Sequence, residues 1–255
     1  MRLFDHRADG SVRPLIFLLA LCFLGAGSSY AQRYFSIEEV SRTVHDKKST
    51  VVDKGIYYTR GGSLNIKWNA GGLTYYSLTS PFGFTDMYYP GTNEKMTLDA
   101  QMFNSRDELL YLFAEGGSED LGMSRSGYVL KSSRKDGSYT VRRYEPARAG
   151  GMCAWVELAL DESFRPVYCA YFNKKGGLIT KTYLSHYTSV QGFSFPMRVT
   201  EISYLKDKND STVRLDVYRN LRIDEIDDMH VYHIPPGAVS VDIKEGLKAL
   251  KKQSK

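Results

Sequence analysis

Leu64-Asn65-Ile66-Lys67-Trp68 decides how this chain folds, because its side chains alternate strictly between apolar and polar. A β-strand points successive side chains to opposite faces, so this period of two predicts a strand with one buried and one wet face. Val213-Arg214-Leu215-Asp216-Val217 repeats the pattern far along the chain. The 19 tyrosines and 12 phenylalanines also suit half-buried strands. The sequence therefore predicts a mainly β protein.

Further runs of strand character are separated by turn residues such as Gly71-Gly72 and Lys135-Asp136-Gly137. We expect about eleven short antiparallel strands, and such a series forms a barrel or a strongly curved sheet. Beyond Leu64 to Trp68, the expected strands cover residues 74–80, 84–89, 95–99, 127–132, 138–144, 152–160, 167–172, 178–186, 196–205 and 211–222.

Two or three helices are expected to interrupt the strands. Ser36-Ile37-Glu38-Glu39 matches a capping box and predicts a helix up to His45. Ser105 to Glu115 has an acidic first turn and a broad apolar stripe, and Ile243 to Lys252 is the third candidate. Such a stripe must cover something apolar, here the concave face of the sheet. The predicted fold class is mainly β with a few helices (α+β), with the strands in a barrel or a strongly curved sheet.

Residues 1–31 have the pattern of a cleaved signal peptide. Three arginines precede the apolar run Leu15 to Leu24, and Ser29-Tyr30-Ala31 has the small-x-small pattern of a cleavage site. The run of about ten residues is short of the roughly twenty that span a bilayer. We therefore expect export, one domain over residues 32–242 without a linker, and a basic tail over residues 243–255.

Charge and motifs argue against several other functions. The formal net charge of +5 is too small and too dispersed to suggest nucleic acid. Gly122 to Gly127 does not match a nucleophile elbow, because its second glycine falls one residue late. In an extended segment His230 and His233 point to opposite faces and cannot share one metal ion. We expect no catalytic residues, no metal and no cofactor.

Cys153 and Cys169 are the two cysteines that remain after the expected cleavage. They fall on two predicted strands joined by a turn at Asp161-Glu162-Ser163, so in an oxidising compartment they could form a disulfide. Two buried free thiols, acting as small apolar side chains, are the alternative. The sequence does not fix the register that decides between them.

The order of these segments resembles the LolA-like family of outer-membrane lipoprotein carriers and sorting proteins. In that family a glycine-led strand ends in arginine, a second strand ends near Trp or Tyr, and an aromatic strand runs into a proline turn. The resemblance covers roughly residues 36 to 242. The matching segments are Gly55–Arg60, Leu64–Trp68, Met87–Glu94, Tyr187–Gly192 with Phe195-Pro196, and His233–Ala238.

The resemblance implies a half-open antiparallel β-barrel with a helical lid. It also implies a monomeric periplasmic carrier that is not an enzyme. Such proteins hold the acyl chains of lipoproteins and move them from an inner-membrane release machinery to an outer-membrane acceptor. Arg60 matches the arginine that latches the lid in that family. Gly61 replaces the usual proline after it, His233 stands where phenylalanine is common, and the region from Asp46 to Lys54 looks too short for a full strand.

The resemblance also turns the apolar sets into candidates for lining a lipid cavity, although alternation alone indicates ordinary core. An envelope sensor that binds a regulatory partner is the alternative function of the same fold, and an exported hydrolase is a third. The predicted lipid-binding residues are Leu64, Ile66, Trp68, Met96, Leu98, Leu109, Leu112, Phe113, Val213, Leu215 and Val217.

Overall fold

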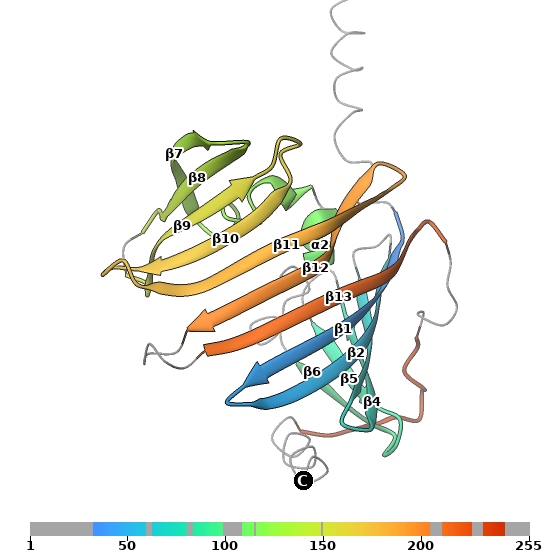
Figure 1. Cartoon of the computed structure of the whole chain (residues 1–255). Coiled ribbons are helices and arrows are strands. Elements are labelled where there is room, and N and C mark those ends of the chain that lie inside the picture. The colour runs from blue at the N-terminus through green and yellow to red at the C-terminus, as the bar shows by residue number, and fades with distance from the viewer. Residues whose placement is uncertain are drawn as a thin grey trace, which may run out of the picture.

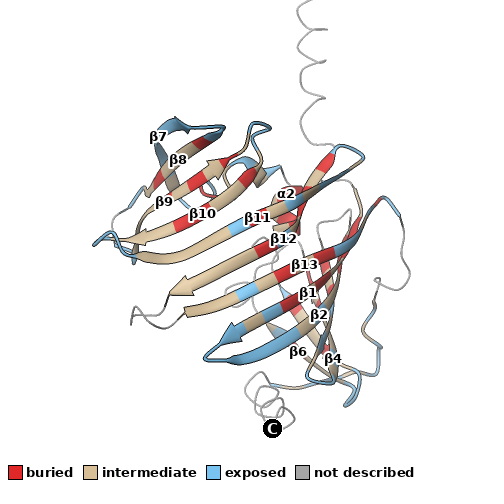
Figure 2. Ribbon diagram, viewed as in Figure 1, coloured by how far each residue is buried: buried red, intermediate tan, exposed pale blue. Residues whose placement is uncertain are grey.

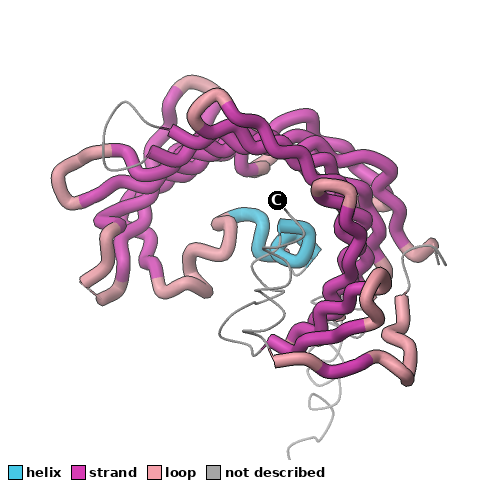
Figure 3. Tube along the Cα trace, turned by 90° about the horizontal axis from the view of Figure 1, so that it is seen from below, coloured by secondary structure: helices cyan, strands magenta, loops and turns pink. Residues whose placement is uncertain are grey.

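The computed structural model describes residues 33–59, 63–80, 84–98, 109–114, 116–148, 150–204, 211–225 and 232–242. In these ranges the strands form one 14-stranded sheet that curves strongly around a concave side (Figure 1 and Figure 3). The expected signal peptide, Arg60 and the tail from residue 243 lie outside the described residues.

The sheet consists of two antiparallel meanders. The first contains β1 (Phe35–His45), β2 (Lys48–Tyr58), β3 (Leu64–Ala70), β4 (Leu73–Thr79), β5 (Thr85–Tyr89) and β6 (Glu94–Leu98). The second contains β7 (Tyr128–Asp136), β8 (Tyr139–Pro146), β9 (Cys153–Leu160), β10 (Pro166–Asn173), β11 (Leu178–Val190), β12 (Phe193–Tyr204) and β13 (Ser211–Ile223). A short parallel strand, β14 (Val239–Ser240), pairs with β6.

The two meanders are joined where β1 pairs with β13. Their register runs from Phe35 opposite Ile223 to Val44 opposite Val213, and β1 pairs with β2 on its other side. The resulting strand order is β14-β6-β5-β4-β3-β2-β1-β13-β12-β11-β10-β9-β8-β7. The sheet therefore has two edges and is not closed into a barrel, and its 14 strands exceed the eleven or so predicted.

β1 overturns one prediction from the sequence. The segment from Ser36 to His45 was expected to be helical, but it is a strand, and β2 begins at Lys48, where the sequence looked too short for a strand. Phe35 and Ile37 are both buried on one face, with exposed fractions of 0% and 1%. Pairing with two neighbouring strands outweighs the local capping signal, because tertiary context overrides helix propensity.

Two helical elements in the described residues lie between β6 and β7 in the chain, and both are short. β6 lies next to one edge of the sheet and β7 forms the other edge. The two elements are α2 (Leu109–Ala114) and the 3₁₀ turn η2 (Gly117–Glu119), and Figure 3 shows the helix inside the curve of the sheet. The predicted helix over Ser105 to Glu115 is thus confirmed for Leu109–Ala114. The rest of it lies outside the described residues.

The turn between β9 and β10 depends on Asp161. Its carboxylate accepts hydrogen bonds from the amides of Ser163 and Arg165, both at 2.9 Å, and from Nε of Arg165 at 2.8 Å. Burial favours the protonated carboxyl, but these hydrogen bonds outweigh burial and lower the pKa of Asp161. The carboxylate therefore stabilises the fold at neutral pH.

We predict that Asp161→Asn lowers the free energy of unfolding by about 1–2 kcal/mol at pH 7, because charge-assisted hydrogen bonds are lost. The pKa of Asp161 is lower in the folded state, so its contribution is present above the unfolded-state pKa and disappears as the pH falls through the folded-state pKa. Urea unfolding at pH 7 and at low pH measures the difference. Glu162→Gln, on an exposed neighbour, is the control. Equal destabilisation of Asp161→Asn at both pH values would contradict this account.

Candidate functional site

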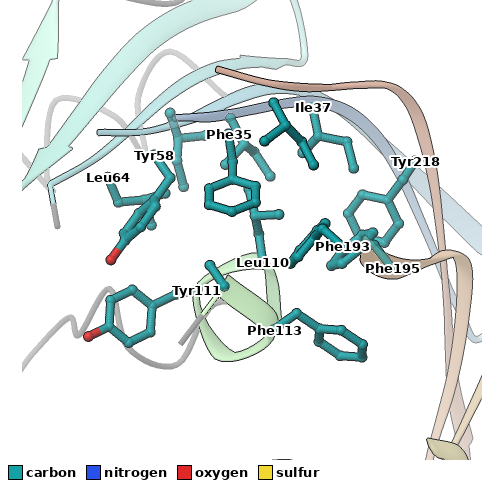
Figure 4. Packing of buried hydrophobic residues seen from close by; sticks show 14 of the residues in the cluster. Phe35, Ile37, Tyr58, Leu64, Leu110, Tyr111, Phe113, Phe193, Phe195 and Tyr218 are labelled. Carbon is teal, nitrogen blue, oxygen red and sulfur yellow. The ribbon is translucent and has the colours of Figure 1, made fainter. Parts of the chain in front are cut away.

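The concave face, which we call the inner face, carries an apolar floor beneath α2. Four of the six residues of α2 are buried against this floor. Phe113 meets Phe195 edge-on with ring centroids 5.3 Å apart, and Tyr111 meets Tyr58 at 5.4 Å (Figure 4). The apolar floor consists of Phe35, Ile37, Ile56, Tyr58, Leu64, Ile66, Leu184, Phe193, Phe195, Val199, Tyr218 and Ile223.

The predicted lipid-binding residues of β3, with Leu109 and Phe113 of α2, lie on or beside this floor; Figure 2 shows the buried parts of the strands in red. Leu64 and Ile66 belong to it, and Met96 on β6 is also buried. Trp68 and Leu109 are half-buried and pack against the same cluster. Leu98 and Leu112 are half-buried as well, and Phe113 is buried in α2.

Val213, Leu215 and Val217 are the exception, because they lie on the outer face of β13. Tyr218 packs on Phe195 of the apolar floor, and its neighbour Val217 must therefore point the other way. The cause is a β-bulge in β13. Its register with β1 shifts by one residue between Ser36 and Glu38, and Asn220, on the β13 side of this shift, has a φ of 55°. A bulge exchanges the two faces of a strand, so an unbroken alternation in the sequence does not stay on one side.

Consequently a chain of polar side chains, which we call the polar track, occupies the inner face beside the apolar floor. Asp216 accepts hydrogen bonds from the Ser41 hydroxyl at 2.6 Å and from Nε of Arg214 at 3.0 Å. A second guanidinium nitrogen of Arg214, Nη2, lies 3.4 Å from the Glu201 carboxylate. The track consists of Lys54, Glu39, Ser41, Asp216, Arg214, Glu201, Ser203 and Thr180.

The charged members of the track compensate one another. Nζ of Lys54 lies 2.7 Å from the Glu39 carboxylate and 4.7 Å from the centre of the Trp68 ring. Glu39 and Asp216 are only 3% and 4% exposed. Burial disfavours the charged guanidinium of Arg214, but Asp216 and Glu201 outweigh burial and raise its pKa. Sequence reasoning missed this track because Arg214 and Asp216 alternate with apolar residues and so resemble the wet face of a strand.

At the end of the track, the inner face of β9 to β12 opens into a hollow of about 980 Å³. Its base includes Cys153, Tyr171, Thr180 and Glu201, from four successive strands. Loops on either side of β7 and β8 form its walls. The remaining lining residues are Ser126, Gly127, Tyr128, Pro146, Ala147, Arg148, Gly151, Met152 and Ile179.

The two cysteines are free thiols in this structure. Cys153 is opposite Asn173 and Cys169 is opposite Leu158, so they are neighbours on adjacent strands but are offset along them. Cys169 is 2% exposed, and burial raises the pKa of its thiol to about 12. Cys169 is buried, as the alternative of two buried thiols expects, whereas Cys153 is half-buried, and the disulfide between them stays a prediction.

The described residues offer little support for metal binding or hydrolase chemistry. These ranges contain no group of three or more His, Cys, Asp or Glu residues able to hold a metal ion. Ser124, from the Gly122 to Gly127 stretch that does not match a nucleophile elbow, lies exposed in a turn where its amide donates to Asp120. No helix in the described part of the chain is both long enough and apolar enough to cross a membrane.

The curved sheet with a short helix across its concave side is a LolA-like fold. The chain superposes on a LolA superfamily protein from Nitrosomonas europaea with a TM-score of 0.51 and 14% identity, covering 79% of this chain and 91% of that one. A DUF1329 family protein from Desulfovibrio piger gives a TM-score of 0.50 and 12% identity, covering 86% and 95%. No protein-family description and no curated protein matches the sequence. At these identities the likeness establishes the fold alone.

The ion pair between Lys54 and Glu39 gives a test of the polar track. Lys54→Met leaves the Glu39 carboxylate buried without this ammonium group, and breaking a buried pair costs about 3–5 kcal/mol. The double variant Glu39→Leu with Lys54→Met removes both charges and is predicted to recover most of that loss. Urea unfolding of the two single variants and the double variant measures the coupling. Additive destabilisation would show that the two groups do not form a pair.

Proposed function

We propose that this protein is a periplasmic carrier that binds the acyl chains of lipoproteins on the apolar floor and moves them toward the outer membrane. In this proposal α2 is the lid, and the acyl chains replace its side chains when it moves away. Acylated lipoproteins, an inner-membrane release machinery and an outer-membrane acceptor are its partners, and it works as a monomer.

One observation carries the proposal: in the described residues, α2 covers the apolar floor with four buried side chains. Most helical stability in proteins comes from packing of an apolar face, so α2 is held in place mainly by its side chains on the floor. Leu110 and Phe113 are 2% and 5% exposed. Withdrawing them uncovers a continuous apolar surface that extends across the sheet from β3 to β11.

The energies of this exchange are closely balanced. Burying a large apolar side chain is worth about 1.5–3 kcal/mol, so withdrawing three from the floor costs roughly 5–9 kcal/mol. An acyl chain that buries ten methylenes returns about 8 kcal/mol at 0.8 kcal/mol each. A near balance is what a carrier requires, because it must release its cargo as well as bind it.

A partner-binding sensor is the second candidate, and a specific observation favours it. The side chains of α2 already fill the space over the floor, so the resting protein needs no lipid there (Figure 4). A sensor of this kind would bind a protein segment on another surface and leave α2 in place.

The two tryptophans allow the carrier proposal to be tested. Trp68 packs against the apolar floor, whereas Trp155 lies on the outer face, stacked on Phe172 at 5.1 Å. We predict that a lipopeptide with a brominated acyl chain quenches Trp68 fluorescence in Trp155→Phe but leaves Trp155 unquenched in Trp68→Phe. The unacylated peptide is the control. Equal quenching of both tryptophans, or none, would reject the carrier proposal and favour the sensor.

Arg60 is proposed as the lid latch. It follows Thr59, whose amide donates to the Ser63 carbonyl at the end of the β2–β3 hairpin. We predict that Arg60→Leu increases the release rate of a bound fluorescent acyl probe about tenfold, as expected for loss of a charge-assisted hydrogen bond, without lowering the melting temperature. Arg198→Leu, at an exposed arginine of β12, is the control. The latch is rejected when both variants release the probe at the rate of the parent protein.

A further inference from the structure

The hollow at the far end of the inner face forms a trough that crosses four strands. Its base passes from Cys153 on β9 through Tyr171 and Thr180 to Glu201 on β12. Neighbouring strands are about 4.8 Å apart, so this base is about 14 Å long. No residue of the apolar floor or of α2 lines it, which separates it from the surface assigned to acyl chains above.

The two ends of the trough differ in polarity. At the β9 end its walls are mainly apolar, formed by Tyr128, Pro146 and Met152, and the Met152 side chain is largely exposed. At the β12 end Thr180 and Glu201 join the polar track, where the Thr180 and Ser203 hydroxyls are 3.3 Å apart. A ligand that lies along this base therefore meets an apolar surface at one end and a polar surface at the other.

The polar end has an excess of negative charge. The single guanidinium of Arg214 lies between two carboxylates, those of Asp216 and Glu201. Asp216 is buried and has two short hydrogen bonds, whereas Glu201 has longer contacts of 3.4 Å with Arg214 and 3.3 Å with Ser203. The Glu201 side chain is 31% exposed. In the part of the chain that the structure describes, this end therefore has one more negative than positive charge, and the more exposed carboxylate, that of Glu201, lines the trough.

The cation that lines the trough does not neutralise this end. Arg148 is exposed and belongs to the connection between β8 and β9, three strands away from Glu201 on β12. Charges that are separated by several strand spacings and exposed to water interact weakly.

We propose that the trough is a second binding site, for a membrane-type amphiphile with an ammonium head group. The head group pairs with Glu201 and the hydroxyls beside it, and the start of the chain lies over Tyr171 and Cys153 toward Met152. Aromatic rings and a carboxylate are together suited to ammonium groups, because both attract positive charge. The proposal concerns a separate site and does not depend on acyl chains binding beneath α2.

Binding of simple amphiphiles below their micelle concentrations tests this site. Titration calorimetry would compare dodecyltrimethylammonium with dodecyl maltoside and dodecanoate, which have the same chain and different head groups, and with tetramethylammonium, which has the head group alone. We expect dodecyltrimethylammonium to bind most tightly of the four. Tight binding of tetramethylammonium would indicate a site for small amines instead of amphiphiles. Equal affinity for the three compounds with a dodecyl chain would exclude recognition of the head group. Either outcome overturns the proposal.

Matched variants locate the site. Glu201→Gln should weaken dodecyltrimethylammonium binding about tenfold and leave dodecyl maltoside unchanged, because only the charge is removed. Glu157→Gln is the control, since Glu157 lines a separate hollow of about 410 Å³ with Tyr168 and Tyr183. Loss of binding in Glu157→Gln, with none in Glu201→Gln, would place the site on that other hollow and overturn the proposal.

A second pair of variants tests the space instead of the charge. Thr180→Phe fills the trough and should abolish dodecyltrimethylammonium binding, whereas Thr200→Phe makes the same change on the other face of the sheet. Quenching of Trp68 by the brominated lipopeptide should be the same in both variants. An unchanged affinity in Thr180→Phe would overturn the proposal, while the Trp68 measurement reports separately on the carrier function.

Discussion

The pairing of β1 with β13 is the interaction on which the rest of the structure depends. It joins two meanders into one sheet and thereby places β6 and β7 toward opposite edges. α2 lies between those two strands in the chain and packs on the apolar floor of the concave side (Figure 1). The same ladder sets Ser41 beside Asp216 and so begins the polar track.

The inner face combines two kinds of surface that are usually kept apart. Its apolar part is covered by α2, and its polar part contains carboxylates that are almost fully buried. Buried ion pairs add little net stability compared with well-packed apolar residues, since desolvation opposes the attraction. The buried ion pairs instead make the concave side asymmetric, because a charged region lies beside an apolar region. A ligand with one polar and one apolar end can distinguish these two regions.

The sequence predicted the elements whose signals are local and failed where partners or bulges decide. Leu64 and Ile66 were placed correctly because strict alternation over a short strand needs no further information. The segment from Ser36 was wrong because a capping box is visible in sequence and a β13 partner almost two hundred residues away is not. Val213 to Val217 were placed on the wrong face because the bulge near Asn220 leaves no clear mark in the alternation. Arg214 and Asp216 were missed for the same reason.

The β1–β13 ladder also has a consequence for the order in which the chain can mature. β1 is among the first segments to be synthesised, and one of its two edges stays unpaired until Ser211 to Ile223 have followed. Closing so long a loop is slow, because its entropy must be lost before the contacts form. β2 to β6 can pair with β1 early, but the concave side is complete only after almost the whole chain has been made. A chain of which fewer than about 220 residues have emerged would therefore expose an edge strand and part of its apolar floor to the surrounding chaperones.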